Sequence, residues 1–181
     1  MKLEMRTLKN IAAAAMTLAV VFGAASLKPV TANAAEASVS ASIEEENSYI
    51  SFQDEAYQNE FLRRVNNERA KAGLKPVQLG DSNHNSAAQE RAEEIATVNS
   101  HVRPNGTKWY TVLSEYGVTD AAAGENAAWG SVSPEEVVNA WMNSEGHRAN
   151  ILDPEARAMG VGYYYNSSSA WGHQWILLFT K

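Results

Sequence analysis

The chain has 181 residues, no cysteine, and a formal net charge of −6 from 15 basic and 21 acidic side chains. A length of this order predicts one domain, and the lack of cysteine excludes disulfides, cysteine-ligated metal centres and a cysteine nucleophile. The acidic balance argues against nucleic-acid binding, which needs clustered Lys and Arg to neutralise phosphates.

Residues 1–34 have the features of an export signal. Basic side chains precede an apolar, Ala-rich run over residues 11–26, and Ala32-Asn33-Ala34 matches the A-x-A pattern of signal cleavage. The apolar run is shorter than the roughly 20 residues that a membrane anchor needs. We therefore predict a signal peptide removed near Ala35, a secreted, extracellular or envelope-associated product, and no stable membrane insertion after cleavage. Export of a chain without cysteine fits a Gram-positive bacterium.

Residues 35–53 are small, polar and acidic, with Glu44, Glu45 and Glu46 in succession. Such a composition buries too little apolar surface to offset the entropy of ordering the chain. This stretch is therefore predicted to be a flexible leader, and the folded domain is expected over residues 54–181.

Helical periodicity follows the leader. Tyr57, Phe61 and Val65 recur at helical spacing and predict one buried stripe, and Gly73 stands where a helix would end. The second expected helix has an Ala-rich inner face, which suits close packing. The helices are expected over residues 54–72, 85–98 and 109–116, and from Ser133 onward.

The clearest helix start is at Ser133. Its hydroxyl can cap the helix, Pro134 suits the first turn, and Glu136 stands at the position that closes a capping box. Two strands are expected late in the sequence, over residues 157–165 and 171–180, joined by a turn. Helices followed by a late hairpin predict an α+β fold, with helices packed on an antiparallel sheet.

The residues able to carry chemistry are histidines and an acid. No zinc-protease, nucleophile-elbow, phosphate-loop or dinucleotide motif occurs, so any site must be assembled by the fold. His101 opens a loop that contains Pro and Gly, and His147 follows Gly146 at the end of a helix. Glu125 lies between them in Gly-Glu-Asn. An acid in that place can orient an imidazole, act as a general base or complete a metal shell.

Six segments stand out when taken together. They are Val65-Asn66-x-Glu68-Arg69, Gln89-x-Arg91-Ala92-x-Glu94, Ser100-His101-x-Arg103-Pro104-Asn105-Gly106, Gly124-Glu125-Asn126, Trp141-Met142-Asn143-Ser144-x-Gly146-His147-Arg148 and Gly160-Val161-Gly162. In this order and spacing they resemble the bacterial branch of the CAP superfamily, whose domain is also called SCP-like. The resemblance covers residues 57–181.

The resemblance implies an α-β-α sandwich with a central antiparallel sheet and a cleft lined by two histidines and two acids. Matched motif by motif, His101 and His147 are the histidines and Glu125 is one acid. In some members of the family the histidines bind zinc or another divalent ion, which would make His101 and His147 the metal ligands. The position of the second acid holds Ser144, and Glu145 is one residue further on, turned by about 100° on a helix. Both stay open as cleft residues.

Three functions are compatible with such a cleft. The favoured one is a secreted, non-enzymatic binding module that takes a divalent metal such as zinc and a small-molecule, lipid or cell-wall ligand. The second is a metal-assisted, peptidase-like hydrolase with Glu125 as general base. The third is a structural protein of the envelope or spore coat. A family resemblance constrains the fold far more than the activity.

Overall fold

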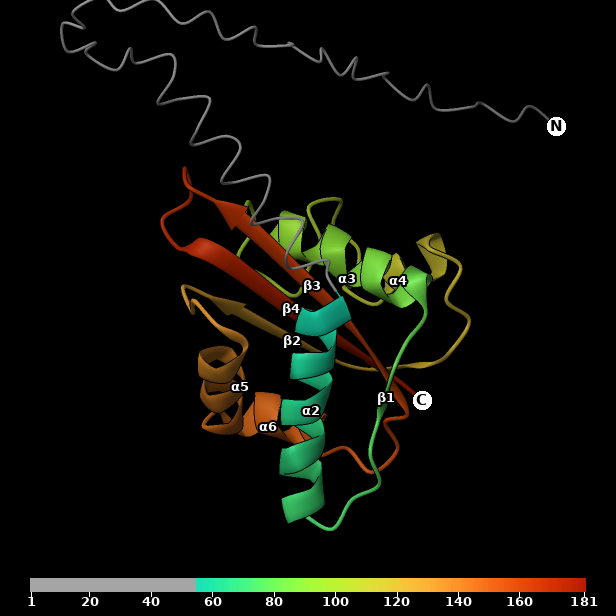
Figure 1. The fold of residues 1–181 in the computed structure, drawn as a ribbon. Coiled ribbons are helices and arrows are strands. Elements are labelled where there is room, and N and C mark those ends of the chain that lie inside the picture. The colour runs from blue at the N-terminus through green and yellow to red at the C-terminus, as the bar shows by residue number, and fades with distance from the viewer. Residues whose placement is uncertain (1–54) are drawn as a thin grey trace, which may run out of the picture. The chain divides into compact units, whose positions relative to one another are not determined.

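Residues 55–181 are the part of the chain that the computed structural model describes (Figure 1). The predicted signal peptide, residues 1–34, and the predicted leader, residues 35–53, lie outside it. Within residues 55–181 no helix is both long enough and apolar enough to cross a bilayer.

Helices and strands alternate along this part of the chain. In order they are α2 (Glu55–Lys71), β1 (Gln78–Leu79), α3 (Ser82–Ile95), α4 (Thr111–Glu115), β2 (Ala122–Trp129), α5 (Pro134–Met142), α6 (Glu145–Ile151), β3 (Ala158–Asn166) and β4 (Gly172–Thr180). The expected first helix and the two late strands are confirmed to within two residues. β1, β2 and α6 were not predicted.

The strands form one sheet in the order β1-β3-β4-β2. β3 and β4 make the predicted hairpin, with Tyr163 opposite Trp175 and Ala158 opposite Thr180. β2 pairs antiparallel with the other side of β4, and the short β1 pairs parallel with β3. β2 is therefore an edge strand of a largely antiparallel sheet.

Helices cover both faces of the sheet (Figure 1). Side chains of β4 alternate between the faces. Trp175 and Leu177 belong to the core shared with α2, α5 and α6, whereas Ile176 and Leu178 belong to the core shared with α3 and α4. The predicted α-β-α sandwich is confirmed, with the aliphatic and aromatic side chains of β4 buried at its centre.

The α3 helix lies unusually close to β3. A Cβ on Gly162 would stand 2.0 Å from the backbone oxygen of Ala88, and a Cβ on Gly160 would stand 2.3 Å from that of His84. The inner face of α3 is lined by fully buried alanines, as its sequence predicted. Glycine on the strand and alanine on the helix thus set the distance between the two layers.

The α3 helix begins at Ser82, three residues earlier than expected. The Asp81 side chain accepts hydrogen bonds from the backbone N–H groups of Asn83 and His84, so Asp81 caps the helix and the residues after it form its first turn. The predicted start at Ser133 is confirmed, since its Oγ accepts from the Glu136 N–H at 3.2 Å. The Glu136 carboxylate bonds the Val132 N–H, one residue before the position that a capping box would use.

Gly162→Ala should lower the free energy of unfolding by at least about 2 kcal/mol, because the new methyl group meets rigid helix backbone and α3 must move away. Chemical denaturation followed by circular dichroism measures the change. Gly146→Ala is the matched control, since a Cβ there meets nothing within 4 Å and its helical site favours alanine. Equal stability of the Gly162 variant and wild type would contradict the close packing.

Candidate functional site

The Gly-Glu-Asn motif lies on the edge strand β2, and strand alternation divides it between the two faces of the sheet. Glu125 points toward α3, where Arg91 contacts it. Asn126 and Gly124 face α6, where the Asn150 side chain contacts both. The motif therefore joins the two helical layers at one edge of the sheet.

The Glu125 carboxylate is completely buried and has two partners. Arg91 donates from Nε to Oε2 at 2.8 Å and from Nη2 to Oε1 at 3.2 Å, which is the strong two-pronged arrangement of a guanidinium on a carboxylate. The His101 ring places Nδ1 2.7 Å from Oε1. Glu125 is thus positioned to hold the His101 ring in one orientation, and the other ring nitrogen, Nε2, lies on the opposite side.

A chain of alternating charges extends this contact beneath the loop that carries His101. Arg91 also pairs with Glu94, and Arg103 lies 2.8 Å from Glu94 and 2.6 Å from Glu115. Both arginines are almost fully buried. Buried charges need such partners, because an unpaired one costs several kcal/mol. The chain of charges therefore fixes the loop to α3 and α4.

His147 is held by a second set of hydrogen bonds on the other face of β2. Asn126 donates to the His147 backbone oxygen at 3.0 Å, and Asn150 donates to the Glu125 backbone oxygen at 3.1 Å. Gly124 leaves room for Asn150, because a Cβ there would lie 2.6 Å from its side chain. The His147 ring is half-buried beside Trp141, with ring centroids 6.5 Å apart. Each residue of the Gly-Glu-Asn motif thus makes a contact, or leaves a space, that the packing around β2 requires.

The two histidines have pKa values displaced in opposite directions. The hydrogen bond that His101 donates to Glu125, helped by the negative charge of that carboxylate, raises the pKa of His101 despite partial burial and the nearby Arg91. Burial lowers the pKa of His147, and the positive charge of His101 lowers it further. From this effect we predict that the two rings are neighbours. We call His101 and His147 the histidine pair.

The two remaining predicted cleft residues, Ser144 and Glu145, lie at the start of α6. Ser144 is the N-cap residue of α6 and is half-buried, and Glu145 is exposed in the first turn of that helix. Neither belongs to the charge chain of Glu125. Among residues 55–181, no three His, Cys, Asp or Glu side chains are gathered as they would be around a metal ion. His101 and His147 as metal ligands stay a prediction.

Sequence reasoning missed Arg91, Glu94 and Arg103 as parts of the site. A signal for Arg91 was present, because it falls on the inward, Ala-rich stripe of α3, where a charged residue needs a buried partner. The partner itself was out of reach, since Glu125 is 34 residues away.

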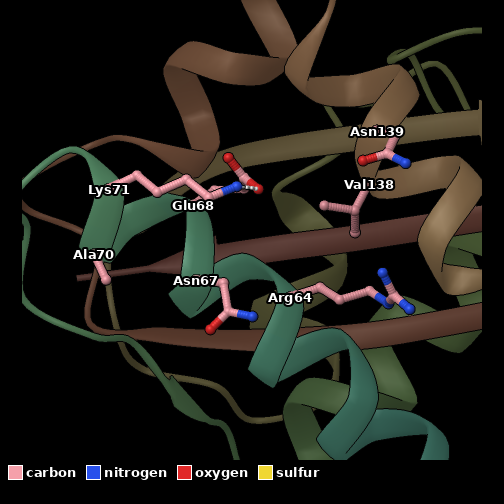
Figure 2. Close-up of a pocket in the computed structure, with 7 residues that line it drawn as sticks. All are labelled: Arg64, Asn67, Glu68, Ala70, Lys71, Val138 and Asn139. Carbon is pink, nitrogen blue, oxygen red and sulfur yellow. Dashed lines mark hydrogen bonds and ion pairs between the residues drawn. The ribbon is translucent and has the colours of Figure 1, made fainter.

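A hollow of about 410 Å³ lies elsewhere, between α2 and α5 (Figure 2). Its lining is mostly polar and contains none of the predicted site residues. Its charged side chains are already paired: Arg64 with Glu135 at 3.0 Å, and Lys71 with Glu68, as the dashed line in Figure 2 shows. The hollow therefore offers a ligand no free charge.

A family model described as the cysteine-rich secretory protein family, CAP, matches residues 62–178. The chain belongs to the CAP family. It is 41% identical over 123 residues to a Bacillus subtilis (strain 168) protein described as uncharacterized protein YkwD, covering 67% of this chain and 47% of that one. The chain thus spans about half the length of this relative.

Two solved structures show the same fold. An extracellular protein containing an SCP domain, from Bacillus anthracis, superimposes with a TM-score of 0.59 at 24% identity, over 68% of this chain and 39% of that one. An outer surface protein from Borrelia burgdorferi gives a TM-score of 0.61 at 20% identity, over 70% of this chain and 93% of that one. The CAP fold read from the sequence is therefore confirmed.

His101→Ala should raise the pKa of His147, because it removes the positive charge that opposes protonation of the second ring. Proton NMR titration of the ring Hε1 signals measures both pKa values in wild type, where His101 should titrate at the higher pH. His173, which contacts Tyr163 elsewhere in the domain, is the internal control and should not change. An unmoved His147 titration would show that the two rings are not neighbours.

Proposed function

We propose that this CAP domain is an exported binding module, which takes a divalent cation together with a small-molecule, lipid or cell-wall ligand at its histidine pair. The observation that carries the proposal is the hydrogen bond between buried Glu125 and the Nδ1 edge of His101. It orients a side chain that is still 56% exposed, so its Nε2 can meet a ligand. The predicted signal peptide supports export, as do the extracellular and outer-surface descriptions of the two structural relatives.

The donor set fits a divalent metal of the zinc type. A metal-binding histidine commonly donates the N–H of its other ring nitrogen to a carboxylate. The contact between His101 Nδ1 and Glu125 has this arrangement. His147 has a lowered pKa, so its ring is neutral and its lone pair free near neutral pH. Imidazole ligands suit zinc and its neighbours. A bound zinc ion would supply open coordination positions for an oxygen of the ligand.

The geometry gives Glu125 a different task from the one that the hydrolase hypothesis assigned to it. Its side chain is buried and both oxygens contact Arg91, one of them also His101, so it is placed to orient a histidine and to stabilise positive charge on it. A general base has to reach the proton that it removes. The half-buried His147 ring is therefore more accessible as a base than the fully buried Glu125 carboxylate.

An acid–base enzyme that uses the two histidines, in place of the metal-assisted hydrolase with Glu125 as base, is the second candidate, and one feature favours it. The pKa values of His101 and His147 are displaced in opposite directions, which is the arrangement of an acid beside a base. In that case, His101 would donate a proton to a leaving group and His147 would accept one from water.

Isothermal titration of the purified chain with zinc chloride should give about one ion per chain. Affinity should rise as the pH rises through the raised pKa of His101, because the metal competes with the proton on that ring. His101→Ala together with His147→Ala should abolish uptake, whereas His173→Ala, the control, should keep it. Equal uptake by wild type and the double variant would overturn the site.

Incubation with peptidoglycan and with casein separates the two candidate functions. The binding module should release no soluble fragments from either, with or without a chelator. Release that is lost in His147→Ala and kept in His173→Ala would establish the enzyme instead.

A further inference from the structure

Two connections of the chain meet at the end of the sheet where β2 finishes. The loop after β2 is hydrogen-bonded there to the first residues of β4, which follow the turn between β3 and β4. Gly130 donates from its backbone to the His173 oxygen at 2.9 Å, and the Trp175 indole donates to the Ser131 oxygen at 2.6 Å. The two connections therefore form one continuous surface, which we call the hairpin end: residues 130–133 and 166–172.

The hairpin end carries the two most exposed large hydrophobic side chains among residues 55–181. Val132 is 59% exposed and Trp171 is 57% exposed. The other tryptophans of the domain are buried or half-buried. A tryptophan left in water forgoes the largest burial contribution that any side chain offers, and exposed apolar groups of this kind mark contact sites for other molecules.

The turn that carries Trp171 is held by its own contacts. The Ser169 N–H donates to the Asn166 oxygen at 3.0 Å, and the Gly172 N–H donates to Ser169 Oγ at 3.0 Å. Gly172 has a φ of +66°, and a Cβ there would stand 3.3 Å from the ring of Tyr165. Trp171 is thus exposed on an ordered turn, so a ligand would bind it without first ordering the backbone.

The electrostatics of the hairpin end identify the class of ligand. No Asp, Glu, Lys or Arg occurs between Arg157 and Lys181, or between Glu125 and Glu135. The turn that leads to Trp171 carries hydroxyl and amide side chains instead, at residues 166–169. The charged residues that follow residues 130–133 are the acids Glu135 and Glu136, and the Glu136 carboxylate accepts from the Val132 N–H at 3.0 Å. The two segments of the hairpin end therefore carry no Lys or Arg of their own with which to bind phosphates or an anionic bilayer.

We propose that Trp171, together with Val132 on the other segment of the hairpin end, is a docking site for a neutral polysaccharide strand. The apolar C–H face of a sugar ring stacks on the indole, and the sugar hydroxyls exchange hydrogen bonds with the serine and asparagine side chains of the turn. The site is separate from the histidine pair: Trp129, at the hairpin end of β2, is four residues from Glu125, about 13 Å along the strand. It does not rest on metal binding.

The test uses two neutral probes, the hexamers of β-1,4-linked N-acetylglucosamine and of β-1,4-linked glucose. Each is titrated into the isotopically labelled full chain, and the backbone and indole N–H signals are followed by NMR. At least one hexamer should shift the signals of Trp171 and of residues 166–169. Trp171→Ala should weaken its binding at least tenfold while the rest of the spectrum stays that of the folded wild type. Tyr110→Ala, an exposed aromatic residue outside the hairpin end, is the matched control and should bind as wild type does.

Three results would overturn the proposal. The first is failure of both hexamers to bind, and the second is equal binding by wild type and Trp171→Ala. The third is displacement of the Trp171 signals by vesicles of phosphatidylglycerol and not by either hexamer, which would make the hairpin end a membrane contact.

Discussion

The pairing of Arg91 with Glu125 is the interaction on which the rest of the site depends. Moving a guanidinium and a carboxylate out of water is costly, and only close geometry with every charge matched offsets that cost. Here Arg91 contacts the carboxylate through two nitrogens and also pairs with Glu94, while His101 takes one oxygen of Glu125. Removing one partner of such a pair typically costs about 3–5 kcal/mol. The α3 helix, the β2 strand and the loop of His101 are therefore coupled through one buried carboxylate.

The same short motif joins the opposite layer through uncharged groups. Asn126 holds the backbone of His147, and Asn150 reaches back to the Glu125 backbone across the space that Gly124 leaves open. An edge strand is free on one side, so residues from both layers can approach each other around it. This placement would let two histidines from different layers, 46 positions apart in the sequence, lie close enough for the charge of His101 to lower the pKa of His147.

The parts of the fold with local signals could be predicted from the sequence. Ser133 and Pro134 predicted the start of α5, and two runs rich in apolar and aromatic residues on either side of a polar turn predicted the hairpin. The β2 strand could not be predicted, because Ala122–Trp129 is mostly Ala and Gly and lacks the β-branched residues that favour strands. Likewise, α6 is only seven residues long and takes its stability from packing.

The candidate site was predictable only as a set of residue types in a familiar order. His101, Glu125 and His147 came from that order, but the role of Glu125 did not, because it depends on Arg91 burying its charge against it. That contact needs the whole sheet in place. The direct measurement is the pKa of His101 in Glu125→Gln, an isosteric change, by NMR at pH values where both chains are folded. A clear fall from the wild-type pKa is expected, because the negative partner is lost. An unchanged pKa would contradict the account that buried Glu125 controls the site.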